Sequence, residues 1–283
     1  MSTVLITGTS TGFGYLTTEL LAGRGWHVFA SMRDLAKKNS LERALRNKGL
    51  LDHVTFEQLD LTDAASIEAT VKSILPQTGN MLDAVVHNAG VAVAGVLEDI
   101  PEAEIRRVME TNFFGVLALT RALLPTFRSQ KRGRIVLVSS QAALAGQPGN
   151  SIYAASKWAL EGWAESLAYE VDPFGIDVIV IEPGPYRTQI WNNTVWIEPA
   201  NSPYQLWVRQ LHQAADWHGA KTSRDPKEVA VAIVNALETP RPRFRYQVGF
   251  FGQARLFLAW QDADLADPQR HHTLSRPATL ALG

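Results

Sequence analysis

Short apolar segments alternate with helical segments along this chain, and that alternation restricts its fold more than any other feature. Strands are predicted over residues 3–6, 26–31, 54–58, 84–87, 134–139, 177–181 and 245–248. Helices are predicted between them over residues 15–24, 35–48, 64–75, 102–128, 153–171 and 226–237, with a last helix over 252–263. Because the strands are apolar throughout, we expect an α/β fold with one doubly wound parallel sheet of about seven strands, covered by helices on both faces.

Composition excludes several classes of protein. The formal net charge of −1 over 283 residues argues against nucleic-acid binding dominated by phosphate contacts. The absence of cysteine excludes disulfides and thiolate metal sites. No apolar run approaches the ~20 residues of a membrane-spanning helix, and the N-terminus lacks a basic leader, so a cytoplasmic protein is expected.

A glycine-rich turn joins the first predicted strand to the first predicted helix. Gly8, Gly12 and Gly14 follow the pattern Gly-x-x-x-Gly-x-Gly, not the Gly-x-Gly-x-x-Gly of the common dinucleotide fingerprint. Such glycines let the backbone approach a pyrophosphate, and the helix N-terminus offers free N–H groups. A tight turn that needs glycine for positive φ is the alternative.

The residues at the end of the second predicted strand indicate which nicotinamide cofactor is bound. An acidic residue there binds the ribose 2′-hydroxyl of NAD, whereas arginine accommodates the 2′-phosphate of NADP. Met32 stands where the acid is expected and Arg33 follows it, so NADP(H) is predicted in preference to NAD(H). Asp34 is expected to cap the next helix rather than to contact a ribose.

Tyr153 and Lys157 lie four residues apart in a predicted helix, so both side chains are expected on one helical face. An adjacent ammonium favours the phenolate and lowers the tyrosine pKa, which suits a proton donor or acceptor near neutral pH. This pair alone is weak evidence, because so short a motif also arises by chance.

Further motifs occur in a fixed order, and together with the turn and the Tyr–Lys pair they resemble the classical short-chain dehydrogenase/reductase family from residue 3 to about residue 188. These motifs are Asp60-Leu61, Asn88-Ala89-Gly90, Asn112, Ser140 thirteen residues before Tyr153, and Pro183-Gly184 with Thr188. His87, where a second asparagine is common, and Phe13, in place of an aliphatic residue, are small departures.

The resemblance implies a Rossmann-type oxidoreductase with a role for each matched residue. Tyr153 would act as general acid or base, Lys157 would lower its pKa and bind the nicotinamide ribose, and Ser140 would hold the substrate oxygen. Asn112 would steady a water that leads protons towards Lys157. No metal site is expected. The implied cofactor site comprises Gly8, Ser10, Thr11, Gly12, Phe13, Gly14, Arg33, Asp60, Leu61, Asn88, Ala89, Gly90, Tyr153, Lys157, Pro183, Gly184 and Thr188.

Residues 186–223 lack clear periodicity and occupy the family's substrate-loop position. The aromatic residues of this insert predict either an apolar lid over a bulky carbonyl substrate or an insert pinned to the body or to a partner subunit; they are Trp191, Trp196, Tyr204, Trp207 and Trp217. His212, His218 and the His271-His272 pair are interpreted as surface residues, and the basic stretch 240–246 as solvated loop charges.

These observations predict one dinucleotide-binding and catalytic domain over residues 1–250, with a C-terminal helix and tail over 251–283 packed on it or extending from it. The predicted activity is NADP(H)-dependent interconversion of a ketone or aldehyde and its alcohol on a hydrophobic substrate. The resemblance implies a homodimer or homotetramer, which family members often assemble through the helices of Asn112 and Tyr153. One alternative is a non-catalytic NADP(H)-binding redox sensor, which has no need of the Tyr153 proton donor. Another is a 3-oxoacyl-thioester reductase, against which the long insert and the extended C-terminus count.

Overall fold

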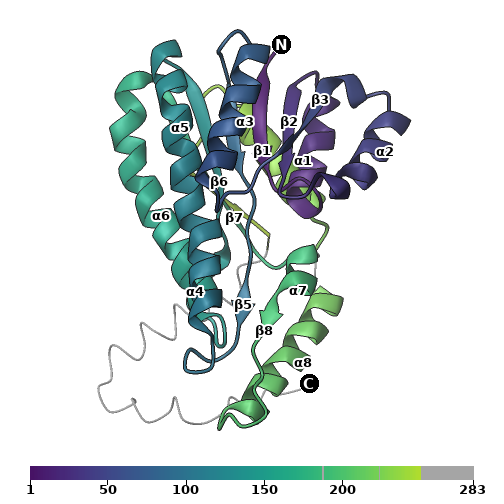
Figure 1. Ribbon diagram of the computed structural model, residues 1–283, viewed down its shortest axis with the longest axis vertical. Helices are drawn as coiled ribbons and strands as arrows, with labels where there is room; N and C mark the ends of the chain where they lie inside the picture. Colours follow the sequence, from purple (N-terminus) through teal and green to yellow (C-terminus); the bar gives the residue numbers. More distant parts are fainter. Residues whose placement is uncertain (187, 223, 250–283) are drawn as a thin grey trace. The chain divides into compact units, whose positions relative to one another are not determined.

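A computed structural model describes residues 1–186, 188–222 and 224–249. The predicted helix over 252–263 and the polar tail lie outside the described residues. The described residues belong to one compact unit, Met1–Phe250, in which a parallel sheet lies between two layers of helices (Figure 1).

Seven parallel strands form the sheet in the order β3-β2-β1-β4-β6-β7-β9. The predicted strands are confirmed, all of them within two residues at either end: β1 (Thr3–Thr7), β2 (His27–Met32), β3 (Val54–Gln58), β4 (Ala84–His87), β6 (Gly133–Val138), β7 (Ile176–Pro183) and β9 (Arg245–Val248). The strand order reverses between β1 and β4. In an open parallel sheet, ligands bind outside the carboxyl ends of the strands at such a reversal.

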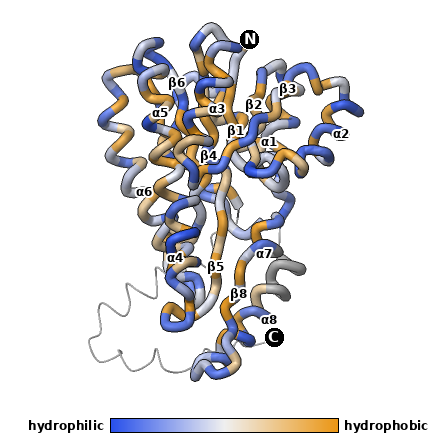
Figure 2. The backbone as a smooth tube through the Cα atoms, viewed as in Figure 1, coloured by the Kyte–Doolittle hydropathy of each residue, from blue (hydrophilic) through white to orange (hydrophobic). Residues whose placement is uncertain are grey.

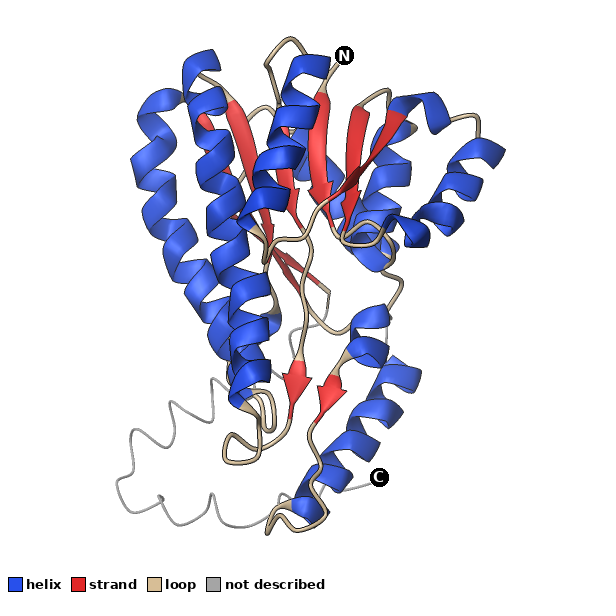
Figure 3. Ribbon diagram, in the orientation of Figure 1, coloured by secondary structure: helices blue, strands red, loops and turns tan. Residues whose placement is uncertain are grey.

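Alternate residues of the strands face opposite helical layers, as the pleat of a strand requires. On one face, Ile6 and Ile181 pack in a core that includes residues of α1 (Gly12–Ala22), α2 (Asn39–Asn47) and α9 (Lys227–Glu238). On the other face, Leu5 and Val180 pack in a core that includes residues of α3 (Ala64–Gln77), α5 (Gly115–Gln130) and α6 (Ser151–Val171). Figure 3 shows helices on both sides of the strands, and Figure 2 shows the hydrophobic character of the central strands between them.

The long helix predicted over residues 102–128 is interrupted. It consists of α4 (Glu102–Met109), a π-helical turn η3 (Glu110–Phe114) and α5, with Asn112 inside the π turn. π turns are rare and occur frequently at functional sites. Pro125 lies within α5, and α3 continues through Pro76 to Gln77 rather than ending at residue 75.

The insert contains structure that its sequence did not predict. It forms α7 (Gln189–Asn193), β8 (Val195–Trp196) and the long helix α8 (Gln205–Thr222), and β8 pairs with β5 (Val93–Ala94) in a separate two-stranded sheet. Helix α8 has little apolar periodicity because, among its described side chains, Val208 alone is buried. Within the described part of the chain, no helix has the length and apolar character needed to cross a membrane.

Short 3₁₀ turns complete the structure: η1 (Leu35–Lys38), η2 (Leu51–His53), η4 (Gln141–Ala143) and η5 (Asp172–Phe174). Two of them bear on the site, because η1 follows β2 and η4 follows β6.

Candidate active site

The glycine-rich turn is fixed by hydrogen bonds from the neighbouring strand β4. The Thr7 hydroxyl accepts hydrogen bonds from the backbone N–H groups of Asn88 and Ala89, both at 3.0 Å. The Asn88 amide in turn donates to the carbonyls of Thr7 and Gly8, at 2.8 and 3.0 Å. The side chain of Asn88 therefore holds the turn in place. Ala89 and Gly90 follow it beyond the carboxyl end of β4.

Close packing explains why glycine occupies this turn. Gly8 has φ +73°, and a Cβ atom there would lie 2.8 Å from the Ala89 Cα. A Cβ atom on Gly14 would lie 2.5 Å from the Asn88 amide nitrogen and 2.6 Å from the Gly8 carbonyl oxygen. Gly12 has φ +63°, and a Cβ atom there would lie 3.7 Å from the Thr188 Cβ. Larger residues at Gly8 and Gly14 would clash with the turn itself and with the residues that follow β4.

Helix α1 begins inside this turn, directly after Ser10 and Thr11. Thr11 makes no side-chain capping bond to the helix, so the first N–H groups of α1 keep their capacity to bind an anion. Phe13 packs edge-on against the buried Tyr186, with ring centroids 5.8 Å apart, which connects the turn to the chain that follows Pro183 and Gly184. These features fit the pyrophosphate of a dinucleotide.

Arg33 and Asp60, two residues of the predicted cofactor site, lie at the ends of β2 and β3. Arg33 is exposed directly after β2. Asp34 caps η1, because its carboxylate accepts a hydrogen bond from the Ala36 N–H at 2.9 Å, and the predicted cap is confirmed. The Asp60 carboxylate accepts hydrogen bonds from the N–H and hydroxyl of Thr62, at 2.9 and 2.7 Å. The neighbouring Leu61 is buried, and its main chain lies close to Gly115.

Ser140 and Tyr153 meet at the carboxyl end of the sheet. Ser140 precedes η4, and its hydroxyl accepts a hydrogen bond from the Ala142 N–H at 3.1 Å. Burial raises the pKa of Tyr153 above its usual value, and a hydrogen bond with the Ser140 side chain offsets part of that rise. The lowered pKa expected from Lys157 is therefore not found, because desolvation of the buried phenol dominates the pKa of Tyr153.

Lys157 is buried beside Tyr153. Its ammonium donates to the Val138 carbonyl oxygen at 2.8 Å and lies 5.8 Å from the centroid of the Tyr153 ring. Burial lowers the pKa of Lys157 to about 8, and the charge of Glu161 acts in the opposite direction. A Cβ atom on Gly90 would lie 3.8 Å from the Lys157 Nζ, so the cofactor segment and the ammonium are neighbours.

Asn112 is positioned by its own hydrogen bonds. Its amide donates to the Val91 carbonyl and the Ser156 hydroxyl, at 2.9 and 3.0 Å, and its carbonyl accepts from the Val91 N–H at 2.9 Å. The π turn directs this side chain towards α6, where Ser156 lies next to Lys157. Ser140, Tyr153, Lys157 and Asn112 are thus brought to one place, whereas Arg33 and Asp60 lie at the ends of β2 and β3.

The insert makes polar and apolar contacts with the rest of the domain near the site. The Ser202 hydroxyl bonds the Asp99 carboxylate at 2.5 Å, and Gly149 lies close to Leu211 of α8. Trp196 stacks on His212, with ring centroids 4.1 Å apart and planes at 14°.

His212, interpreted as a surface residue, is partly exposed but has partners within the insert. Its ring is half-buried, and its Nδ1 lies 2.5 Å from the Glu198 carboxylate. Tyr204 and Trp207 are exposed, at 37% and 38%, so these two rings do not line an enclosed pocket in this structure. The side chains of Trp191, Trp217 and His218 and the His271-His272 pair lie outside the described residues.

The sequence did not point to Tyr186 or to Glu182. The fully buried Tyr186 donates to the Glu228 carboxylate at 3.0 Å. Glu182, at the end of β7, is also fully buried. For Glu182, the available sequence signal was a glutamate next to Pro183 within an apolar strand.

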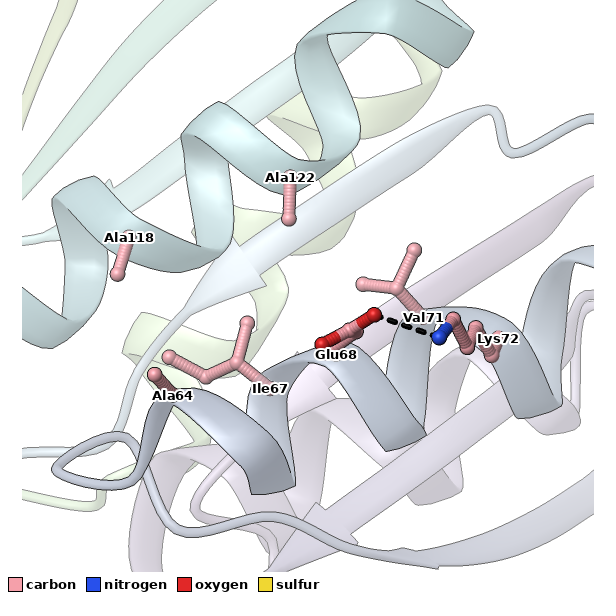
Figure 4. Close-up of a pocket in the computed structure, with 7 residues that line it drawn as sticks. All are labelled: Ala64, Ile67, Glu68, Val71, Lys72, Ala118 and Ala122. Carbon is pink, nitrogen blue, oxygen red and sulfur yellow. Dashed lines mark ion pairs between the residues drawn. The ribbon is translucent and has the colours of Figure 1, made fainter.

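A separate groove of about 350 Å³ lies between α3 and α5 (Figure 4). Glu68 and Lys72 form an ion pair at 2.5 Å along its edge. It contains none of the predicted site residues, since its lining is Ala64, Ile67, Glu68, Val71, Lys72, Ala118 and Ala122.

Comparison with known proteins agrees with the fold. The pattern that defines the short chain dehydrogenases matches residues 2–196. A 3-ketodihydrosphingosine reductase from Bacteroides thetaiotaomicron is 33% identical over 251 residues, which are 87% of this chain and 87% of that protein. Human retinol dehydrogenase 8 is 36% identical over 255 residues, covering 87% of this chain and 80% of its own.

A solved short-chain dehydrogenase from Streptomyces avermitilis has the same fold. It superposes with a TM-score of 0.79 at 32% identity, with 97% of each chain covered. With the family pattern over most of the chain and relatives above 30% identity along nearly all of it, this chain belongs to the short-chain dehydrogenase/reductase family of oxidoreductases.

Proposed function

We propose that this protein is an NADP(H)-dependent oxidoreductase that interconverts a ketone or aldehyde and its alcohol on a hydrophobic substrate, with Tyr153 as the general acid or base. The observation that carries the proposal is that the side chains of Ser140 and Tyr153 are neighbours beside the buried ammonium of Lys157. This arrangement supports contact of one carbonyl oxygen with both a proton donor and a second hydroxyl.

Tyr153 is suited to donate a proton. Because burial raises its pKa, the phenol is protonated at neutral pH and can donate to the carbonyl oxygen during reduction. Ser140 polarises the same oxygen. The nicotinamide cofactor supplies or accepts the hydride. In the direction of alcohol oxidation, Tyr153 receives the proton instead.

Lys157 supports this chemistry through its charge. With a pKa of about 8, its side chain is mostly an ammonium at neutral pH and loses its proton as the pH rises through that value. The ammonium stabilises negative charge that develops on Tyr153 as the proton leaves. Asn112 stands next to Lys157 through Ser156 and would hold the water from which the site is reprotonated.

NADP(H) is favoured by the residues after β2. Asp34 is engaged as a helix cap, so its carboxylate is not directed at a ribose hydroxyl. Arg33 is exposed beside it and is available to a 2′-phosphate. A guanidinium binds a phosphate more strongly than a neutral hydroxyl, which gives the preference for NADP(H).

A hydrophobic substrate is supported by the relatives. The two named relatives are described as acting on 3-ketodihydrosphingosine and on retinol, both of which are largely apolar.

We also infer a homodimer or homotetramer formed through the helices of Asn112 and Tyr153. Large apolar side chains are exposed there, with Phe114 at 49%, Trp158 at 52% and Tyr169 at 83%. Such side chains commonly become buried at subunit interfaces. Light scattering during gel filtration should show a mass of two or four chains, and a single-chain mass would contradict the inference.

The Tyr153→Phe variant tests the catalytic role. NADPH binding, followed by nicotinamide fluorescence, should be unchanged, while reduction of a panel of apolar ketones should fall by about 10²-fold or more. Tyr169→Phe is the matched control, because Tyr169 is an exposed tyrosine on the same helix. Retention of ketone reduction in Tyr153→Phe would refute the assignment. Tight NADPH binding by the wild-type protein without turnover of any ketone would favour the redox sensor instead.

The Arg33→Ala variant tests the cofactor. Loss of a charge-assisted phosphate contact should weaken NADPH binding by about 10- to 100-fold and leave NADH binding unchanged. Arg46→Ala, an exposed arginine on α2, is the control. An unchanged preference for NADPH in Arg33→Ala would show that Arg33 does not bind the 2′-phosphate.

A further inference from the structure

Two consecutive residues of α6 contact the chain on either side of Ser140. The ammonium of Lys157 donates to the carbonyl oxygen of Val138, two residues before Ser140, at 2.8 Å. The indole N–H of Trp158 donates to the carbonyl oxygen of Ala142, two residues after Ser140, at 3.0 Å. Helix α6 therefore holds the segment that contains Ser140 at two points.

A single residue connects the Trp158 indole to the Ser140 hydroxyl. The carbonyl of Ala142 accepts from Trp158, and the N–H of Ala142 donates to the Ser140 Oγ at 3.1 Å. Ala142 is buried, at 2% exposed. A displacement of Ala142 would therefore move the N–H group that orients the Ser140 hydroxyl.

The bond from Ala142 also determines what the Ser140 hydroxyl can do. A serine hydroxyl has one proton to donate and two lone pairs that accept. Because the Ala142 N–H occupies one lone pair, the hydroxyl keeps its proton for another acceptor. A substrate oxygen beside Tyr153 would be that acceptor in the proposed reaction.

The turn η4, which contains Ala142, depends on contacts from outside. It has three residues, Gln141–Ala143, and a 3₁₀ turn has poorer hydrogen-bond geometry than an α-helix. Two bonds of 3.0 Å within this segment end on the carbonyls of Ser140 and Gln141. The next carbonyl, that of Ala142, accepts from Trp158. The indole therefore ties the turn to α6.

The exposure of Trp158 allows its hydrogen bond to be tested apart from its packing. The side chain is 52% exposed, so little of the core depends on it. Phenylalanine at this position would remove the N–H donor and keep an aromatic ring on the surface of α6. The effect of the bond can thus be measured with little loss of buried apolar area.

We propose that Trp158 is a positioning residue: through the Ala142 carbonyl it fixes the turn that orients the Ser140 hydroxyl towards the substrate oxygen. Lys157 holds the chain before Ser140, and Trp158 holds the chain after it. The proposal rests on the proposed function of Ser140 as the group that holds the substrate oxygen. Small displacements of such a group lower the rate of the reaction that it assists.

Ketone reduction by single and double variants tests whether Trp158 acts through Ser140. Trp158→Phe should lower kcat about tenfold and leave NADPH binding within about twofold of the wild type. Ser140→Ala should lower kcat by about 10²-fold or more. In the Ser140→Ala background, Trp158→Phe should change kcat by less than about twofold, because no hydroxyl remains to be positioned.

Trp163→Phe is the matched control, because it removes an indole N–H further along the same helix; its kcat should stay near that of the wild type. A tenfold fall caused by Trp158→Phe in both backgrounds would reveal an effect that does not pass through Ser140 and would overturn the proposal. An unchanged kcat in Trp158→Phe would also overturn it. Light scattering should give Trp158→Phe the mass of the wild type, whereas loss of assembly together with activity would assign the effect to a subunit interface instead.

NMR without substrate separates this inference from the proposed function. Tyrosine labelled with ¹³C at Cζ reports the surroundings of each phenol, and the chain has 6 tyrosines, so the Tyr153 signal can be assigned from Tyr153→Phe. Because Ser140 and Tyr153 are neighbours, Ser140→Ala should shift this signal, and Trp158→Phe should shift it in the same direction by a smaller amount. Trp158→Phe should cause no further shift in the Ser140→Ala background, which distinguishes positioning from a direct effect of the indole ring.

This pattern of shifts would support the positioning role even if no ketone were reduced, in which case only the proposed activity would fail. A Tyr153 signal that is unchanged in Trp158→Phe would refute the positioning role whatever the activity. A shift of equal size in both backgrounds would refute it as well.

Discussion

Replacement of His87 by asparagine is expected to make the fold less sensitive to acid. His87 ends β4 and is 2% exposed, and its Nε2 lies 3.0 Å from the Thr120 hydroxyl on α5. Its Nδ1 has no partner among the described residues. Burial lowers the pKa of His87 from 6.5 to about 3, so the folded protein keeps the ring neutral over most of the acid range.

The magnitude follows from the difference in proton binding between the folded and unfolded chains. Below about pH 6.5 the unfolded chain binds a proton at His87 that the folded chain does not bind. Stability is therefore fully present above that pH and decreases as the pH falls towards about 3, by about 1.4 kcal/mol per pH unit. At about pH 5 the loss is about 2 kcal/mol, a large part of the ~5–15 kcal/mol that stabilises a typical domain.

Urea unfolding at about pH 7.5 and about pH 5 measures this loss. The decrease in the free energy of unfolding between the two conditions should be about 2 kcal/mol smaller in His87→Asn than in the wild type. Thr120→Val is the matched control, because it removes the hydroxyl partner and should cost about 1 kcal/mol at both pH values without changing the pH dependence. An equal decrease in the wild type and in His87→Asn would refute the argument that burial keeps His87 neutral.

Three further substitutions test the packing of the site and the fold. Gly14→Ala should weaken NADPH binding by about tenfold or more in a fluorescence titration, because the new methyl group would lie 2.5 Å from the amide that holds the glycine-rich turn; unchanged affinity would show that the turn can move aside. Gly133→Ala would place a methyl group 2.4 Å from the ring of the buried Phe127, so unfolding should cost about 1–3 kcal/mol less, and a melting temperature equal to that of the wild type would contradict this. Alanine substitutions at Trp196 and His212, made singly and together, should reveal a coupling of about 0.5–1.5 kcal/mol from their stacked rings, and strictly additive effects would exclude it.

Local patterns in the sequence were sufficient to predict the sheet and the residues of the candidate site. The strands β3 and β4 have the predicted bounds, because runs of apolar and β-branched residues between turns report burial directly. Tyr153 and Lys157 lie on one face of α6 as their spacing requires. The capping role of Asp34 was also predictable, since a cap depends on residues two or three positions away.

Interactions between distant residues were not predictable from such patterns. Helix α8 was missed because few of its described side chains are buried, which leaves no apolar stripe to recognise. The π turn places Asn112 against Ser156, 44 residues further along the chain, and no local signal marks that contact. The stacking of His212 on Trp196 likewise depends on how the insert folds back on itself.

The sequence alone therefore predicted the α/β architecture, which the structure confirms, and the residues of the candidate site, whereas only the tertiary structure decides the electrostatics of these residues. The spacing of Tyr153 and Lys157 predicted a lowered tyrosine pKa, but burial raises it, because desolvation depends on every element that covers the ring. The buried ion pairs of Arg245 with Glu161 and Glu182 exist only because β9 pairs with β7 under α6, 84 and 63 residues from the two glutamates along the chain. Periodicity reports which side chains are buried, but the charge that each buried group carries depends on the neighbours that folding brings to it.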